Sequence, residues 1–276
     1  MTGARTRRRL DDELVAQGLF RTRDEAMRAV LAGEVSSRGE RLTSPGAQVR
    51  PGCELHVRVA SRYVSRGGLK LEGALDAFGL DPTGLSCLDV GCSTGGFTDC
   101  LLKRGARRVA AVDVGRAQFA WSLRTDERVS LFEDTNICDA DPVLLGAPFD
   151  LAVADVSFTS VARILDSVCA LLGPQGALCT LVKPQFEAAR DEVDGGGVVR
   201  DPAVHARVLR DTLATFGRSA LSVQALGVSP IHGAKGNIEF FLYARKGVSV
   251  LPVDVDAVVA QAWGSAGDSG ALRAQA

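Results

Sequence analysis

Seven short apolar runs follow one another between residues 86 and 244, and segments of helical length separate the first six. Runs of this kind are typical of strands buried on both faces, so they indicate a mainly parallel sheet with helices on either side. The last two runs are joined only by GVSPIHGAKGN, which suits a hairpin rather than a crossover helix. The pattern therefore predicts an α/β fold with a Rossmann-like, doubly wound sheet of seven strands. The expected strands are Ser86–Val90, Val109–Val114, Val129–Phe132, Leu151–Val156, Ala177–Val182, Ala220–Leu226 and Ile238–Ala244.

The first sixty residues have a different character. Apolar residues at helical spacing predict two short helices within residues 8–33, and prolines and glycines then punctuate short strand-like runs up to residue 59. Residues 1–62 hold 12 arginines, no lysine and eight acidic residues, whereas the rest of the chain is slightly acidic. This asymmetry favours a small module that binds a polyanion, although a solvated basic surface would have the same composition.

Composition excludes several classes of protein. With 46% hydrophobic and 24% charged residues, the chain is neither wholly disordered nor fibrous. No window approaches 18 uncharged apolar residues, and no apolar core follows the basic start as a secretory signal would require. Seven cysteines without a CxxC motif give poor support for disulfides or a zinc site. We therefore expect free thiols, no metal and a cytoplasmic location.

A glycine-rich loop, LDVGCSTGGFT, follows the first expected strand and opens a helix. Its glycines let the backbone turn sharply and approach a ligand closely. A dinucleotide-binding loop would have a glycine two places after Gly91, where this chain has Ser93, so NAD is the weaker interpretation. Asp89, just before the loop, suits a cationic group such as an ammonium rather than a phosphate.

Polar residues also follow the next strands, at the edge of the sheet where ligands of open α/β folds bind. Asp113 can accept both hydroxyls of a ribose, and the segment EDTN at residues 133–136 is placed for an adenine edge. An ammonium, a ribose and an adenine without phosphates describe S-adenosylmethionine, and a seven-stranded sheet ending in a hairpin is the usual methyltransferase variant. The predicted cofactor-binding residues are Asp89, Gly91, Cys92, Ser93, Gly95, Gly96, Asp113, Asp134, Asn136 and Asp155.

Histidine offers no evident catalytic set, because the three histidines lie in the small module, a predicted helix and the hairpin turn. Two lysines and two carboxylates are better candidates. Asp155 and Lys183 end neighbouring strands, Glu239 opens the last strand, and Lys70 lies just ahead of the sheet. A ribose hydroxyl must lose its proton as it attacks a methyl group, and a neutral lysine can take that proton. We predict Lys183 as this base, with the other three positioning it and the ribose. The alternative is a set of surface ion pairs of little consequence.

The motifs combine in a recognisable order. The N-terminal part contains RRLDDELVAQGLF, TRDEAMRAVLAGEV and QVRPGCELHV. The remainder contains YVSRGGLKLEGAL, CLDVGCSTGGFTDCLL, DTNI, ADVSF, LVKPQFEA, GGVVRDPAVH and GNIEFF. With these motifs the chain closely resembles the TlyA/haemolysin A family, which joins an S4 RNA-binding domain to an FtsJ-like methyltransferase domain.

The resemblance implies S-adenosylmethionine-dependent 2′-O-methylation of cytidine in 16S or 23S ribosomal RNA, or in both. It also implies a Lys-Asp-Lys-Glu tetrad, which falls on Lys70, Asp155, Lys183 and Glu239. The implied organisation is a small α+β S4-like domain over residues 1–60, a linker over 61–66, a methyltransferase domain over 67–250 and a tail over 251–276. The end of that tail, from about residue 262, lacks apolar periodicity, and we expect it to be disordered.

Ribosomal RNA and ribosomal subunits are the expected partners of a monomeric protein without metal or membrane contacts. Arginines would contact RNA phosphates, which positions a protein but carries little sequence information. The predicted RNA-binding residues are Arg5, Arg7, Arg8, Arg9, Arg21, Arg23, Arg28, Arg38, Arg62 and Arg66. Two other functions stay open, a ribosome-binding factor without catalysis and a membrane-active haemolysin. No basic amphipathic helix supports the latter.

Overall fold

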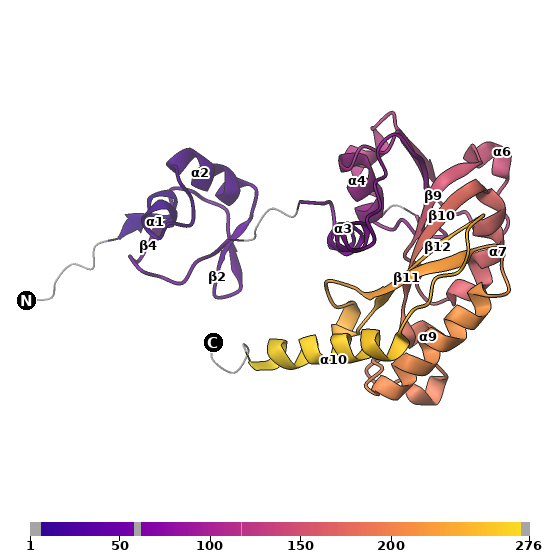
Figure 1. The fold of residues 1–276 in the computed structure, drawn as a ribbon. Coiled ribbons are helices and arrows are strands. Elements are labelled where there is room, and N and C mark those ends of the chain that lie inside the picture. The colour runs from indigo at the N-terminus through magenta and orange to yellow at the C-terminus, as the bar shows by residue number, and fades with distance from the viewer. Residues whose placement is uncertain (1–6, 58–61, 117, 272–276) are drawn as a thin grey trace, which may run out of the picture. The chain divides into compact units, whose positions relative to one another are not determined.

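The computed structural model describes residues 7–57, 62–116 and 118–271, with side chains up to residue 264. Within these ranges the chain forms two compact units, which divide after Arg62 (Figure 1). No helix in the described part of the chain is long and apolar enough to cross a membrane.

The first unit is built around two short helices. Leu10 of one helix and Ala26 and Val30 of the other are fully buried in a common core. The second helix starts at a capping box, in which the Thr22 hydroxyl accepts from the Glu25 amide and the Glu25 carboxylate accepts from the Thr22 amide. Short strands form two small sheets, β1-β4 and β3-β2-β5. The elements are β1 (Arg8–Arg9), α1 (Leu10–Ala16), α2 (Arg23–Leu31), β2 (Val35–Ser37), β3 (Glu40–Leu42), β4 (Gln48–Val49) and β5 (His56–Val57).

The second unit contains a seven-stranded sheet in the order β11-β12-β10-β9-β6-β7-β8. The five strands from β10 to β8 are parallel, and β12 is antiparallel to both β10 and β11. This confirms the predicted α/β class and the Rossmann-like sheet with a terminal hairpin. The elements are α3 (Gly67–Phe78), β6 (Ser86–Val90), α4 (Gly96–Lys103), β7 (Arg108–Val112), α5 (Trp121–Arg124), β8 (Val129–Phe132), α6 (Pro142–Leu145), β9 (Phe149–Ala154), α7 (Val161–Leu171), β10 (Leu172–Val182), α8 (Pro184–Glu187), η1 (Arg190–Glu192), α9 (Pro202–Phe216), β11 (Ser222–Val228), η2 (Ala234–Gly236), β12 (Phe240–Arg245) and α10 (Val255–Ala271).

Both faces of this sheet are covered. Leu88 and Val90 of β6 belong to one apolar cluster with residues of α7, α9 and α10, whereas Cys87 belongs to a second cluster with residues of α3 and α4. Figure 1 shows α3 and α4 on one side of the sheet and α7 and α9 on the other. Burial on two faces explains why the strands are apolar at successive positions and why polar side chains gather at the strand ends.

The segment between the units differs from the expected linker. Tyr63 is buried in the second unit, and its ring closes against α3, so that a Cβ on Gly68 would lie 2.2 Å from it. The Val64 amide donates to the Asp99 carboxylate over 2.8 Å. Residues 63–66 are therefore part of the second unit, because an aromatic side chain and a buried carboxylate hold them there.

The C-terminal segment also differs from the expected tail. Residues 255–271 form α10, and Val255, Val259 and Ala262 are buried against the sheet cluster at helical spacing. Trp263 adds a hydrogen bond from its indole Nε1 to Nδ1 of His205 in α9, over 3.1 Å. A helix with this apolar stripe docks, although the sequence beyond it is rich in small residues. The last residues of the tail that was expected to be disordered, 272–276, lie outside the described residues.

Candidate active site

The glycine loop after β6 forms a tight backbone turn. Gly91 has a φ of +79°, and a Cβ at this position would lie 2.8 Å from the carbonyl oxygen of Asp155. Gly95 caps α4 with a φ of +91°, and a Cβ on Gly96 would lie 2.3 Å from Oγ of Ser65. The glycines are therefore required, because side chains would collide with the chain that closes around the loop.

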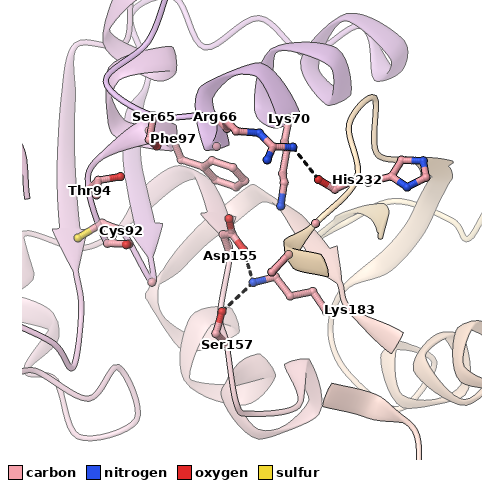
Figure 2. Close-up of a pocket in the computed structure, with 16 residues that line it drawn as sticks. Ser65, Arg66, Lys70, Cys92, Thr94, Phe97, Asp155, Ser157, Lys183 and His232 are labelled. Atoms are coloured by element: carbon pink, nitrogen blue, oxygen red, sulfur yellow. Dashed lines mark hydrogen bonds and ion pairs between the residues drawn. The ribbon is translucent and has the colours of Figure 1, made fainter. Parts of the chain in front are cut away.

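A cavity of about 320 Å³ opens beside this loop, beyond the carboxyl ends of β6, β9 and β10. Figure 2 shows side chains from the start of α3, from the glycine loop and from the segments after β9 and β10 around it. The cavity is thus at the edge where polar residues were expected. Its lining residues are Ser65, Arg66, Gly67, Lys70, Gly91, Cys92, Ser93, Thr94, Gly96, Phe97, Asp155, Ser157, Lys183, His232, Gly233 and Ala234.

Lys183 follows β10 and is almost fully buried at the cavity wall. Its Nζ lies 2.5 Å from Oδ1 of Asp155 and donates to Oγ of Ser157 over 2.9 Å (Figure 2). The ring of Phe186 lies beneath the ammonium, with 5.7 Å between Nζ and the ring centroid. Three side chains thus fix the amine, and Pro184 begins the helix that follows it.

Lys70 reaches the same cavity from α3. Its Nζ lies 2.5 Å from Oε2 of Glu239, which is buried just before β12. Gly233 lines the cavity, and Glu239 lies behind it. A Cβ added at Gly233 would lie 2.0 Å from Oε1 of Glu239. The four residues predicted to act together therefore form two ion pairs, and both ammonium groups line one cavity.

The acidic residues near the loop are placed unequally. Asp89 is fully buried and does not line the cavity; its Oδ2 accepts from the Thr98 hydroxyl over 2.6 Å. Its Oδ1 is buried without a hydrogen-bond partner among the described residues, and burial raises the pKa of Asp89 to about 7. Asp113 accepts from the Ser93 and Gly115 amides, each over 2.7 Å, so it braces the loop from the end of β7.

The residues predicted for the adenine edge lie away from the cavity lining. Asp134 is exposed, has a φ of +56° and pairs with Arg116. Asn136 accepts from the Cys138 amide through its Oδ1 over 3.1 Å. Their roles in cofactor binding stay predictions.

The cavity also contains residues that the sequence did not single out. Ser157 binds the Lys183 amine, and Ser65, Thr94 and Phe97 line the wall near the loop. Ser157 lies two residues after Asp155 within ADVSF, so its place after a strand was the available signal. Ser65 comes from the chain entering α3, which no local pattern connects to the loop.

The residues present fit S-adenosylmethionine. Gly91 and Gly96 of the loop line the cavity, and the Asp89 Oδ1 beneath the loop is a buried acceptor without a partner among the described residues. Asp113 retains acceptor capacity at the end of β7, because each carboxylate oxygen can accept more than one hydrogen bond. This donor and acceptor set suits a ligand with an ammonium and ribose hydroxyls.

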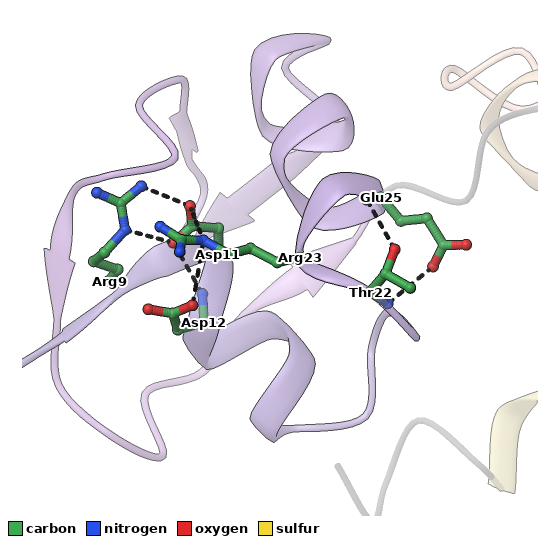
Figure 3. A network of polar contacts seen from close by, with 6 residues as sticks. All are labelled: Arg9, Asp11, Asp12, Thr22, Arg23 and Glu25. Carbon is green, nitrogen blue, oxygen red and sulfur yellow. Dashed lines mark hydrogen bonds and ion pairs between the residues drawn. The ribbon is translucent and has the colours of Figure 1, made fainter.

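The predicted RNA-binding arginines differ in their surroundings. Arg9 and Arg23 both bind the buried carboxylate of Asp11, at 2.7 and 3.1 Å (Figure 3), and Arg9 chiefly holds the pKa of Asp11 below its usual value. Arg8 pairs with the buried Glu13. These guanidinium groups are partly neutralised and fixed in place.

The remaining arginines are mostly exposed. Arg7, Arg21, Arg28 and Arg38 are exposed in the first unit, which Arg62 ends. Arg66 belongs to the second unit, where it lines the cavity and donates to the His232 carbonyl over 3.0 Å. Arg5 lies outside the described residues.

Comparisons with known proteins point in one direction. Residues 63–246 match the model of FtsJ-like methyltransferases. The 16S/23S rRNA (cytidine-2′-O)-methyltransferase TlyA of Mycobacterium tuberculosis is 44% identical over 244 residues, which cover 87% of this chain and 90% of that protein. Hemolysin A of Brachyspira hyodysenteriae is 38% identical over 236 residues, covering 85% and 98%.

A solved structure is similar over nearly the whole chain. It comes from Streptococcus thermophilus and is described as a candidate hemolysin. It is 42% identical, covers 97% of this chain and 99% of its own, and has a TM-score of 0.74. The similarity therefore includes the N-terminal segment that precedes the family match.

Proposed function

Because this chain belongs to the FtsJ-like methyltransferase family, we propose that it transfers a methyl group from S-adenosylmethionine to the 2′-hydroxyl of a cytidine in ribosomal RNA. The observation that carries the proposal is the approach of two lysine–carboxylate pairs to one cavity beside a glycine loop. The names of the TlyA relatives support cytidine as the nucleoside and 16S or 23S RNA as the substrate.

Lys183 takes the proton that the ribose hydroxyl releases as its oxygen forms the new bond to carbon. When bound, S-adenosylmethionine supplies an electrophilic methyl group and leaves as a neutral thioether. Lys183 acts as the base in its neutral amine form, because only an amine with a free lone pair can accept the proton. Asp155, at 2.5 Å, aims the amine and stabilises the ammonium that it becomes. Ser157 holds the same Nζ from a second direction.

Lys70 and Glu239 position the nucleotide. Glu239 offsets the charge of Lys70 within the protein and holds its Nζ at the cavity. The Lys70 ammonium can then donate a hydrogen bond to the ribose oxygen that attacks the methyl group. Such positioning contributes to catalysis because the reacting atoms are held at close range before the reaction begins.

The first unit supplies affinity for RNA. Its exposed arginines, among them Arg7, Arg21, Arg28 and Arg38, contact phosphates and so place the second unit on a folded ribosomal RNA. Residues 1–60 form the RNA-binding domain of this proposed enzyme, and residues 67–250 form its methyltransferase domain. Contacts to the phosphate backbone leave the choice of nucleotide to the shape of the ribosomal subunit.

The proposal is tested by incubating the purified chain with S-adenosylmethionine labelled in its methyl group and with separated ribosomal subunits. Digestion of the RNA to nucleosides should place the label in 2′-O-methylcytidine. Label on a base, or ribosome binding without any transfer of label, would contradict the proposal. Leakage of dye from liposomes, the alternative suggested by the name hemolysin, is not expected.

A further inference from the structure

Gln185 is a polar residue behind the cavity wall for which the reaction described above has no role. We propose that Gln185 is a positioning residue, whose side-chain amide holds Glu239 and, through it, holds Lys70 in register with Lys183. This inference rests on the proposed function, since it concerns the geometry of the same site.

The short helix α8 connects the two lysine pairs. It starts directly after Lys183. Two of its last three residues contact the ion pairs, and the third anchors the helix to α7. Nε2 of Gln185 donates to Oε1 of Glu239 over 3.3 Å. The Phe186 ring lies under the Lys183 amine, and the Glu187 carboxylate accepts from the Ser160 hydroxyl over 2.6 Å at the start of α7. Any shift of α8 would therefore change both ion pairs together.

Glu239 has one defined position because it is enclosed on several sides. Its Oε2 is bound by Lys70, and its Oε1 receives the Gln185 amide and lies against Gly233. The side chain is buried, so solvent cannot replace a lost donor without entering the protein. Removing the amide of Gln185 frees Oε1 and lets the carboxylate rotate, which would carry the Lys70 amine with it.

The orientation of the amide follows from the same contact. If the amide were reversed, its oxygen would face a carboxylate oxygen, which is repulsive. In the observed orientation Oε1 of Gln185 is buried and has no hydrogen-bond partner among the described residues. A buried acceptor without a partner lowers the free energy of unfolding. An apolar side chain of equal length would remove this cost at position 185, but it would leave the buried Oε1 of Glu239 without its donor.

The first test replaces Gln185 with methionine, which preserves length but not the donor. We expect kcat for methyl transfer to ribosomal subunits to fall at least tenfold. KM for the RNA and Kd for S-adenosylmethionine should stay within about twofold. The melting temperature should change little, because Gln185→Met removes one unpartnered buried oxygen and leaves another. The matched control is Gln224→Met, because Gln224 is a part-buried glutamine of β11 that donates to backbone carbonyls. Its kcat should match the unaltered protein.

The second test is Gln185→Glu, assayed from pH 6 to pH 9. When protonated, the new carboxyl can donate to Glu239 as the amide does, and when ionised it repels that residue. Two carboxylates at this distance do not both ionise readily. The ratio of variant to unaltered kcat should therefore be near one at low pH and fall at least tenfold as the pH rises. For Gln185→Met the ratio should not change with pH.

Either of two results would overturn the inference. One is a Gln185→Met protein with an unaltered kcat. The other is a Gln185→Met protein whose melting temperature and cofactor affinity fall together with kcat, accompanied by a Gln185→Glu ratio that is constant with pH. The proposed function fails separately, if the unaltered chain transfers no methyl group to ribosomal RNA.

Discussion

Nζ of Lys183 lies 2.5 Å from Oδ1 of Asp155, and the two residues come from the ends of adjacent parallel strands. Thr180 of β10 is opposite Ala154 of β9, so Asp155 and Lys183 leave the sheet side by side. Parallel pairing thus brings an acid and a base together that are distant along the chain. The same strand ends bound the cavity beside the glycine loop.

Replacing Asp155 with asparagine should lower kcat by about 10²-fold or more, because the Lys183 amine loses the carboxylate that aims it and stabilises its charged form. Binding of S-adenosylmethionine should weaken much less, since Asp155 approaches Gly91 through its backbone carbonyl. Single-turnover rates and titration calorimetry separate the two effects. Ser157→Ala, which leaves the ion pair intact, should have a smaller effect on kcat. Equal losses of kcat and affinity in Asp155→Asn would contradict the assignment.

Gly91→Ala should weaken the binding of S-adenosylmethionine at least tenfold and lower the free energy of unfolding. The positive φ alone costs roughly 1–2 kcal/mol for a residue with a Cβ, and the collision with the Asp155 carbonyl adds to it. Gly84→Ala is the control, since Gly84 has a φ of +74° with nothing within 4 Å of the added Cβ. Calorimetry and urea unfolding should show a stability loss in both variants and an affinity loss in Gly91→Ala alone.

The buried Asp89 should make stability depend on pH. Burial raises its pKa to about 7, so between about pH 4 and pH 7 the folded state holds the proton more tightly than the unfolded chain. Its contribution to stability therefore falls as the pH rises through this window. Asp89→Asn cannot ionise, so the melting temperature of the variant minus that of the unaltered protein should increase from pH 5 to pH 8, measured without cofactor. A difference that is constant with pH would contradict the raised pKa.

Exposed arginines of the first unit should contribute to RNA affinity through phosphate contacts. Arg7→Ala and Arg21→Ala should each weaken binding to ribosomal RNA and reduce the salt slope of log K by about 1. Arg218, exposed in the second unit, provides the control substitution Arg218→Ala. Filter binding between 50 and 300 mM salt measures the slope. An unchanged slope in both first-unit variants would remove these residues from the RNA surface.

The sequence was sufficient to predict the sheet, because burial on both faces makes each strand an apolar run that is visible without a structure. It also placed Asp155 and Lys183 at one edge, since residues after parallel strands share that edge. Their association with Lys70 was a hypothesis from residue type, and the family resemblance implied the same tetrad. Lys70 lies on a helix ahead of the sheet, and only the packing of α3 brings it to the cavity.

Other features depend on tertiary packing that no local pattern encodes. The sequence predicted Asp89 as a partner for an ammonium but not its complete burial beneath the loop or its hydrogen bond from Thr98. Gln185 lies in a short helix whose contact with Glu239 joins segments far apart in sequence. Composition alone suggested that Arg9 and Arg23 are free to contact RNA phosphates. In the structure both guanidinium groups pair with the carboxylate of Asp11.

The assignment of Lys183 as the base is tested most directly by mapping ribose methylation with the Lys183→Ala protein. We predict that the unaltered chain forms 2′-O-methylcytidine in ribosomal RNA, and that Lys183→Ala binds S-adenosylmethionine with similar affinity but forms this nucleoside at least 10²-fold more slowly. Mass spectrometry of digested RNA from timed reactions gives both rates. Methylation by Lys183→Ala at the unaltered rate would contradict the account.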